Sequence, residues 1–148
     1  MNKHLIALAL AALASGGAFA QAGDTLAKIK SKGEITLGTR DSSGALAFTI
    51  GDGKYVGFHT EMAENIAADI GKQLALPKLT VNKQLVTSQN RIPLVMNGTV
   101  DLECGSTTNN ATRQKDVAFA VTTYVAEVRI AARADPGLPP IKALNGKN

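Results

Sequence analysis

Strand-like and helix-like segments alternate along residues 24–132, and this alternation constrains the fold more than any other feature of the sequence. Residues 34–38 and 79–86 have the apolar and β-branched composition of strands, whereas residues 59–76 carry apolar side chains at helical spacing. Such alternation is typical of layered proteins in which helices cover a sheet. The sequence therefore predicts an α/β fold.

Residues 59–76 give the strongest helical signal. Large apolar residues recur every four positions, and alanines fill the adjacent stripe. The residues concerned are Met62, Ile66, Ile70, Leu74, Ala63 and Ala67. We expect this stripe to pack in the core, with Thr60 capping the start of the helix and Pro77 ending it.

Glycine, proline and asparagine predict where the remaining elements begin and end. A short helix should run from Asp24 to Ser31, a hairpin should form around residues 51–53, and Pro93 places a helix between Asn90 and Asn97. Three further elements are expected: a strand over residues 100–104, a short helix from Asn109 or Asn110 that carries Arg113, and one or two strands over residues 117–132.

The first twenty residues have the features of a secretory signal peptide. Lys3 and His4 precede an apolar run over residues 5–13, and residues 18–20 fit the small-x-small cleavage pattern. We expect residues 1–20 to be removed and the mature chain, beginning at Gln21, to be exported to the periplasm without a lipid anchor. No later segment approaches the ~20 apolar residues of a membrane-spanning helix.

The composition argues against several classes of function. The net charge is only +4 in 148 residues, and apart from Lys28, Lys30 and Lys32 no basic tract stands out, so nucleic acid is not an expected partner. Cys104 is the only cysteine and there are two histidines, which leaves no disulfide within these residues and little for a metal site. We expect no metal and no cofactor, a buried Cys104, and solvated positions for the three lysines and Lys72.

Three loops that follow predicted strands each combine an arginine with hydroxyl-bearing residues. They contain Arg40, then Ser88 and Arg91, then Ser106, Thr108 and Arg113. Because loops at the carboxyl ends of parallel strands meet at one edge of a sheet, we expect them to converge on a ligand. A guanidinium group pairs with a carboxylate through two parallel hydrogen bonds, so three arginines predict a ligand with two negative groups. A single loop arginine is often a surface residue, but the repetition in three loops favours a site.

Two motifs in these loops are specific. One is Thr87-Ser88-Gln89-Asn90-Arg91-Ile92-Pro93, and the other is Glu103-Cys104-Gly105-Ser106-Thr107-Thr108-Asn109-Asn110 followed by Arg113. Together with Tyr55-Val56-Gly57-Phe58, they resemble the periplasmic glutamate/aspartate-binding proteins of ABC importers. The resemblance runs from about Asp24 to Lys147. It implies an incomplete three-layer first lobe over residues 21–133, and a linker with the start of a second lobe over residues 134–148.

The same resemblance implies a function and a set of site residues. The protein would bind glutamate or aspartate and deliver it to an ABC permease in the inner membrane. Arg113 with Thr108 would bind the α-carboxylate, and Ser106 would help to hold the ammonium group. The side-chain carboxylate would be bound by Arg40, Ser88 and Arg91. Family members close two lobes over the ligand; we expect the second lobe to be absent from this chain and the protein to be a monomer.

Two other functions stay open on the residues alone. An enzyme on the same fold, similar to a periplasmic dehydratase or a murein lyase, would need a carboxylate in the site. Glu103 is the nearest one, but strand alternation places it on the same face as Asp101, before the loop. A sensor domain of a larger membrane protein is the other alternative. With no pair of nucleophile and base near the motifs, we expect a binding protein and not an enzyme.

Overall fold

The computed structural model describes residues 24–127, so the predictions for the signal peptide and for residues 134–148 lie outside the described residues. In chain order the elements are α2 (Thr25–Lys32), β1 (Glu34–Thr39), the 3₁₀ turn η1 (Gly44–Leu46), β2 (Phe48–Thr49), β3 (Tyr55–Val56), α3 (Phe58–Gln73), β4 (Thr80–Leu85), α4 (Arg91–Met96), β5 (Leu102–Glu103) and the 3₁₀ turn η2 (Arg113–Lys115). Within this part of the chain, no helix is both long enough and apolar enough to cross a membrane.

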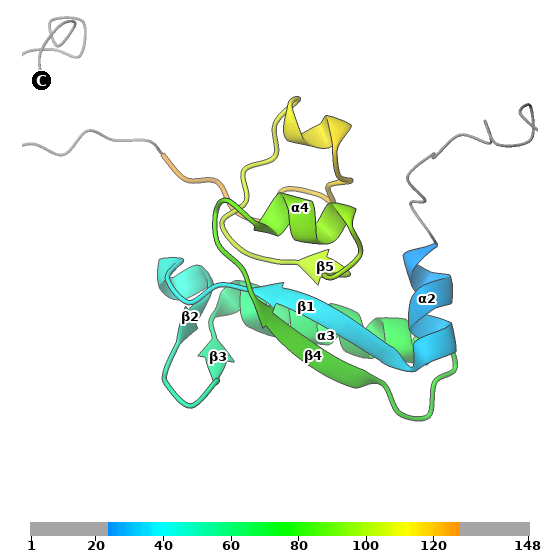
Figure 1. Ribbon diagram of the computed structural model, residues 1–148. Helices are drawn as coiled ribbons and strands as arrows, with labels where there is room; N and C mark the ends of the chain where they lie inside the picture. Colours follow the sequence, from blue (N-terminus) through cyan, green and yellow to red (C-terminus); the bar gives the residue numbers. More distant parts are fainter. Residues whose placement is uncertain (1–23, 128–148) are drawn as a thin grey trace, which may run out of the picture.

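Strands β4, β1 and β5 form a parallel sheet with β1 in the centre (Figure 1). β1 pairs with β4 along its whole length, and it pairs with β5 through Leu37 and Gly38, which lie opposite Leu102 and Glu103. Because the three strands run in the same direction, their carboxyl ends lie at one edge of the sheet. The predicted α/β fold with converging strand ends is confirmed.

Both faces of the central strand are covered. On one face a buried core joins β1 to α2 and to α3, which runs behind the sheet in Figure 1. The core residues are Ile29, Ile35, Leu37, Ala63 and Ala67. On the other face Gly38 lies against Val100, which is in the segment between α4 and β5: a β-carbon at Gly38 would lie 3.0 Å from Cγ1 of Val100. The sheet therefore lies between two layers, as the three-layer prediction requires.

Several element boundaries coincide with the residues that predicted them. The carboxylate of Asp24 accepts hydrogen bonds from two backbone N–H groups in the first turn of α2, and Gly33 ends that helix with a left-handed φ of 67°. Pro93 lies in the first turn of α4, where its missing N–H interrupts no helical hydrogen bond. Strands β2 and β3 pair in antiparallel orientation around residues 51–53.

Helix α3 differs from the prediction in its cap, whereas its predicted buried stripe is confirmed at Ala63 and Ala67 but not at Ile66. Gly57, and not Thr60, is the capping residue; its φ is 120°, and a β-carbon there would clash with the carbonyl oxygens of Ala45 and Leu46 in η1. The buried stripe follows Ala63 and Ala67, whereas Ile66 is 37 % exposed. Small side chains let the helix approach the sheet closely, and the larger residues Ile70 and Leu74 pack against this core while partly buried.

The last part of the described chain has less regular structure than predicted. Residues 117–127 contain no helix or strand, and residues 128–132 of the same predicted segment lie outside the described range. Strand β5 is only two residues long, so its outer edge offers few backbone groups for pairing with another strand. The short helix expected from Asn109 or Asn110 is reduced to the single turn η2, which Arg113 opens.

Lys28 fixes α2 to the turn before β5, so its predicted solvated position is wrong. Its Nζ donates to the carbonyl oxygen of Gly98 (2.6 Å) and to Oδ1 of Asp101 (2.7 Å). The other carboxylate oxygen of Asp101 accepts from the backbone N–H of Thr36 (2.8 Å), and the Asp101 side chain is only 3 % exposed. A nearly buried carboxylate thus connects a helix, the central strand and the approach to β5. By contrast, Lys72 is solvated as predicted.

We predict that Asp101→Ala lowers the free energy of unfolding by about 2–3 kcal/mol, because it leaves Lys28 and the N–H of Thr36 without their buried acceptor. Urea unfolding followed by circular dichroism measures the change. Asp69→Ala is the matched control, since it removes a carboxylate from an ion pair that is exposed on both sides. This control should have little effect, and equal losses in the two variants would contradict the prediction.

Candidate functional site

The loops that follow β1, β4 and β5 meet at the carboxyl edge of the sheet. Nη1 of Arg40, after β1, donates to the carbonyl oxygen of Val86, after β4, over 2.7 Å. The hydroxyl groups of Ser43 and Ser106 share a hydrogen bond of 3.0 Å, which joins the loop after β1 to the loop after β5. The convergence predicted from the sequence is therefore present in the structure.

Arg91 is the most deeply buried of the three arginines, with a side chain that is only 6 % exposed. Its Nη1 lies 3.8 Å from Oε1 of Glu103, and within residues 24–127 neither its Nε nor its Nη1 has a hydrogen-bond partner. Burial lowers the pKa of the Arg91 guanidinium, the charge of Glu103 raises it, and the charges of Arg40 and Arg113 lower it again. The three arginines therefore share one electrostatic environment.

Glu103 places a carboxylate inside this group of arginines. Its side chain is 8 % exposed, and its Oε2 accepts a hydrogen bond of 2.7 Å from the hydroxyl group of Thr107. Two glycines make room for it: a β-carbon at Gly38 would lie 3.2 Å from Cγ of Glu103, and one at Gly105 would overlap with Oε1. The backbone is thus shaped to hold this carboxylate beside Arg91.

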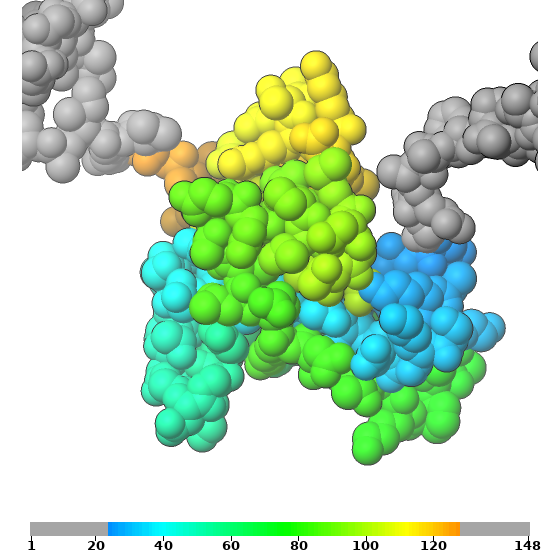
Figure 2. All heavy atoms as spheres, in the orientation of Figure 1, coloured from blue at the N-terminus to red at the C-terminus, as the bar shows by residue number. Residues whose placement is uncertain are grey.

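The other two arginines are partly exposed and hold their own loops. Besides Val86, Arg40 donates to the hydroxyl groups of Ser42 and Ser43, so three of its five N–H groups are used within the protein. Nη1 of Arg113 donates to the carbonyl oxygen of Thr108 over 2.9 Å. The segment that carries Arg113, in yellow, stands out above α4 in Figure 2.

The three hydroxyl-bearing residues that were predicted as site residues are exposed: Ser88, Ser106 and Thr108. Ser88 lies in a turn that its neighbours hold. The Thr87 hydroxyl accepts from the N–H of Asn90 (3.2 Å), and the Asn90 side chain accepts from the N–H of Thr87 (2.7 Å). This reciprocal pair, of the capping-box type, fixes the turn that leads into α4 and so helps to direct Arg91 inward.

Glu103 and Thr107 lie beside Arg91 at the candidate site, although neither was among the predicted site residues. In the sequence, Glu103 lies at the end of a predicted strand, three positions before the hydroxyl-bearing run that begins at Ser106. A carboxylate in this position could have indicated a buried ion pair with one of the arginines. The strand pairing that places Glu103 opposite Gly38 is not visible in local sequence. Its position beside Arg91 therefore depends on contacts between segments far apart in the chain.

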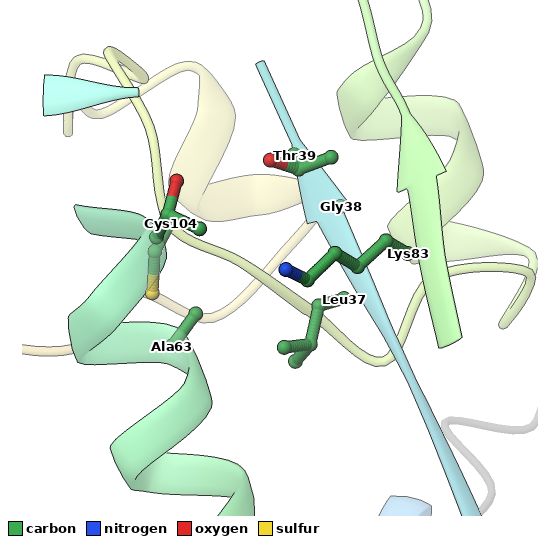
Figure 3. Close-up of a pocket in the computed structure, with 7 residues that line it drawn as sticks. Leu37, Gly38, Thr39, Ala63, Lys83 and Cys104 are labelled. Atoms are coloured by element: carbon green, nitrogen blue, oxygen red, sulfur yellow. The ribbon is translucent and has the colours of Figure 1, made fainter. Parts of the chain in front are cut away.

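Cys104 lines a small cavity on the α3 side of the sheet and not the arginine cluster. Figure 3 shows its side chain beside Ala63, with Lys83 reaching across from β4 over Leu37. Burial, and then the negative charge of Glu103, raises the pKa of the Cys104 thiol to about 11. The thiol is therefore protonated near neutral pH. Cys104 packs against the core, but it is partly and not fully buried, which corrects the prediction of a buried residue. Among residues 24–127 no cluster of three or more His, Cys, Asp or Glu side chains could hold a metal ion.

We predict that Cys104 in the folded chain reacts with iodoacetamide at pH 8 about a hundredfold more slowly than in urea, because only about one thiol in a thousand is ionised at a pKa of about 11. Mass spectrometry of alkylated protein gives both rates. In the folded chain the rate should rise as the pH approaches 11. Since folding raises this pKa, the free energy of unfolding should fall as the pH rises from the pKa of the thiol in the unfolded chain toward 11. Equal alkylation rates in the folded and unfolded chain would exclude this protection.

We predict that Gly105→Ala lowers the free energy of unfolding by about 1–3 kcal/mol, because the added methyl group would overlap with Oε1 of Glu103 and lie 3.0 Å from Cγ of Arg40. Gly71→Ala is the control: its methyl group would meet Leu79 at an ordinary 3.4 Å, and alanine is favoured over glycine in a helix by about 0.5–1 kcal/mol. Thermal unfolding should show a lower melting temperature for Gly105→Ala, whereas the melting temperature of Gly71→Ala should stay the same or rise. A Gly105→Ala variant as stable as the unchanged chain would show that this glycine is not required.

Comparison with known proteins gives the family. Residues 35–141 match the bacterial extracellular solute-binding proteins, family 3. The L-glutamate/L-aspartate-binding protein of Pseudomonas aeruginosa is 45 % identical over 125 residues, covering 84 % of this chain and 41 % of that protein. The glutamate/aspartate import solute-binding protein of Escherichia coli K12 is 42 % identical over 137 residues, covering 88 % of this chain and 45 % of that protein. The chain spans about half the length of the curated relatives it matches.

Solved structures give the same fold and match it as a single lobe. A solute receptor for L-cysteine from Neisseria gonorrhoeae has a TM-score of 0.56 at 30 % identity, over 65 % of this chain and 37 % of that one. Domain 1 of the T. maritima arginine-binding protein ArgBP has a TM-score of 0.57 at 24 % identity, over 67 % of this chain and 71 % of that one. The chain belongs to the bacterial extracellular solute-binding proteins, family 3.

Proposed function

We propose that this chain is part of a receptor that binds an acidic amino acid, glutamate or aspartate, and delivers it to an ABC permease in the inner membrane. The observation that carries the proposal is the meeting of Arg40, Arg91 and Arg113 at one edge of the sheet. Such a concentration of positive charge suits a ligand with two carboxylates. The names of the Pseudomonas aeruginosa and Escherichia coli relatives support the same class of ligand.

The free hydrogen-bond donors of Arg91 support a division of roles among the residues. Its Nε and Nη1 donate to no other group within the described residues, although the side chain is buried, and a ligand carboxylate would satisfy them. We assign the side-chain carboxylate of the ligand to Arg91, Arg40 and Ser88. The α-carboxylate is assigned to Arg113 with Thr108, and Ser106 helps to hold the ammonium group.

The proposal includes the organisation of the chain and its location. Residues 1–20 act as a signal peptide, residues 21–133 form the first ligand-binding lobe, and residues 134–148 lead toward a second lobe. The mature protein works as a monomer in the periplasm. Membership of a family of extracellular solute-binding proteins supports this location.

The enzyme alternative has less support than the binding function. The curated relatives that the chain matches are binding proteins, not enzymes. Glu103, the carboxylate that a reaction would need, is beside a buried arginine and accepts a hydrogen bond from Thr107.

We predict that glutamate and aspartate bind this chain and that glutamine binds at least about tenfold more weakly, because its amide cannot form the ion pair with Arg91. Titration followed by NMR detects binding into the millimolar range, and calorimetry measures it where it is tighter. Arg91→Met should reduce glutamate affinity by at least about tenfold and glutamine affinity by less than about threefold.

Lys115→Met is the matched control for this experiment. Lys115 lies in the same turn as Arg113 but is exposed, so the variant removes one positive charge near the site without removing a proposed contact. It should bind glutamate about as well as the unchanged chain. Equal affinity for glutamate and glutamine in the unchanged chain would contradict the two-carboxylate proposal.

A further inference from the structure

The arginine cluster contains its own carboxylate, and the two buried charges in it do not satisfy each other. The side chains of Arg91 and Glu103 are 6 % and 8 % exposed, yet their nearest polar atoms, Nη1 and Oε1, are 3.8 Å apart. Within residues 24–127, both of these atoms and Nε of Arg91 lack a hydrogen-bond partner. Buried polar atoms are normally paired, so this arrangement requires a reason.

The structure shows what keeps the two groups apart. The hydroxyl group of Thr107 donates to Oε2 of Glu103 over 2.7 Å, and the side chain lies against Gly38 and Gly105, where any β-carbon would crowd it. The carboxylate is therefore held near enough to Arg91 to offset its charge, but not near enough to use its hydrogen-bond donors. Those donors stay free for a second acceptor.

We propose that Glu103 is a positioning residue that acts as the internal counter-ion of Arg91 and limits the affinity of the site for anions. It stabilises the buried guanidinium in the empty site, and its negative charge opposes a ligand carboxylate that binds to the same guanidinium. This inference rests on the proposed function, because it concerns the same site and the same ligand class.

The charges of the cluster indicate how Glu103 affects selectivity. Three arginines and one glutamate leave a net charge of two, which matches the two carboxylates of an acidic amino acid. Without the charge of Glu103 the cluster would carry three positive charges. A dicarboxylate would then gain more than an amino acid with a neutral side chain, since only the dicarboxylate brings a second negative group to Arg91.

The test compares Glu103→Gln with Asp116→Asn. Both variants remove one negative charge, but Asp116 is exposed next to η2. Its backbone N–H donates to the carbonyl oxygen of Arg113, a contact that Asp116→Asn keeps, and within residues 24–127 its carboxylate forms no ion pair with a guanidinium group. The probes are glutarate, glutamate and glutamine, titrated into the full chain. Glu103→Gln should tighten glutarate and glutamate binding by about tenfold and change glutamine binding by less than about threefold. Asp116→Asn should change all three by less than about threefold. A residue with a purely structural role would not tighten binding when it is replaced.

A second measurement needs no ligand and works even where Glu103→Gln weakens the fold. Glu103→Gln should raise the equilibrium constant of unfolding by at least about tenfold, because it leaves Arg91 buried without a counter-charge. In the Arg91→Met background the same substitution should not raise that constant, because Glu103 is then a buried carboxylate that has already lost its partner. Urea unfolding of the four chains in this cycle gives the coupling.

The outcomes separate this proposal from the proposed function. Failure of the unchanged chain to bind any of the three probes overturns the proposed function, and the unfolding cycle then decides whether Glu103 and Arg91 act as a pair. Normal binding by the unchanged chain, with Glu103→Gln no tighter for glutarate than Asp116→Asn, overturns the proposal and leaves the function intact. Additive effects in the unfolding cycle overturn it as well.

Discussion

The parallel pairing of β1 with β4 and β5 is the constraint on which the site depends. It places the ends of three strands at one edge, where Arg40 contacts the carbonyl oxygen of Val86 and Ser43 contacts Ser106. Each loop alone carries an ordinary set of polar residues. Only the common direction of the strands brings the three arginines into one electrostatic environment, and a shift of one residue in β5 would turn Glu103 away from Gly38.

Features of the fold that depend on nearby residues could be predicted from the sequence. Asp24 and Gly33 bound α2, and Pro93 places α4, because capping and proline geometry act within one turn. Helical spacing predicted that Ala63 and Ala67 face the core, but it did not predict the cap of α3 or the exposure of Ile66, since these depend on contacts with other segments. Gly57 is required by the carbonyl oxygens of Ala45 and Leu46 in η1, and Ala63 and Ala67 pack in the core against the sheet. Residues 117–127 have strand-like composition but no strand, because composition does not supply a pairing partner.

The sequence predicted which loops meet at the site, but not how deeply its charged side chains are buried or which of them lie together. Arginines and hydroxyl-bearing residues after three strands indicated an anion site. The depth of Arg91, and the carboxylate beside it, depend on packing between α4 and the sheet and on the glycines that make room for Glu103. The ion pair of Lys28 could not be predicted from local sequence for the same reason, because its partner Asp101 is more than seventy residues away in the chain.

A buried arginine whose donors are not all used is unfavourable for stability, and that cost is consistent with a binding role. The free energy needed to keep Arg91 out of water is only partly offset by Glu103 at 3.8 Å. A closer contact would stabilise the empty lobe, but it would also occupy the donors that a ligand carboxylate needs. The position of Glu103 is therefore a compromise between the stability of the empty site and the strength of anion binding, and Thr107, through its hydrogen bond to Oε2, helps to maintain it.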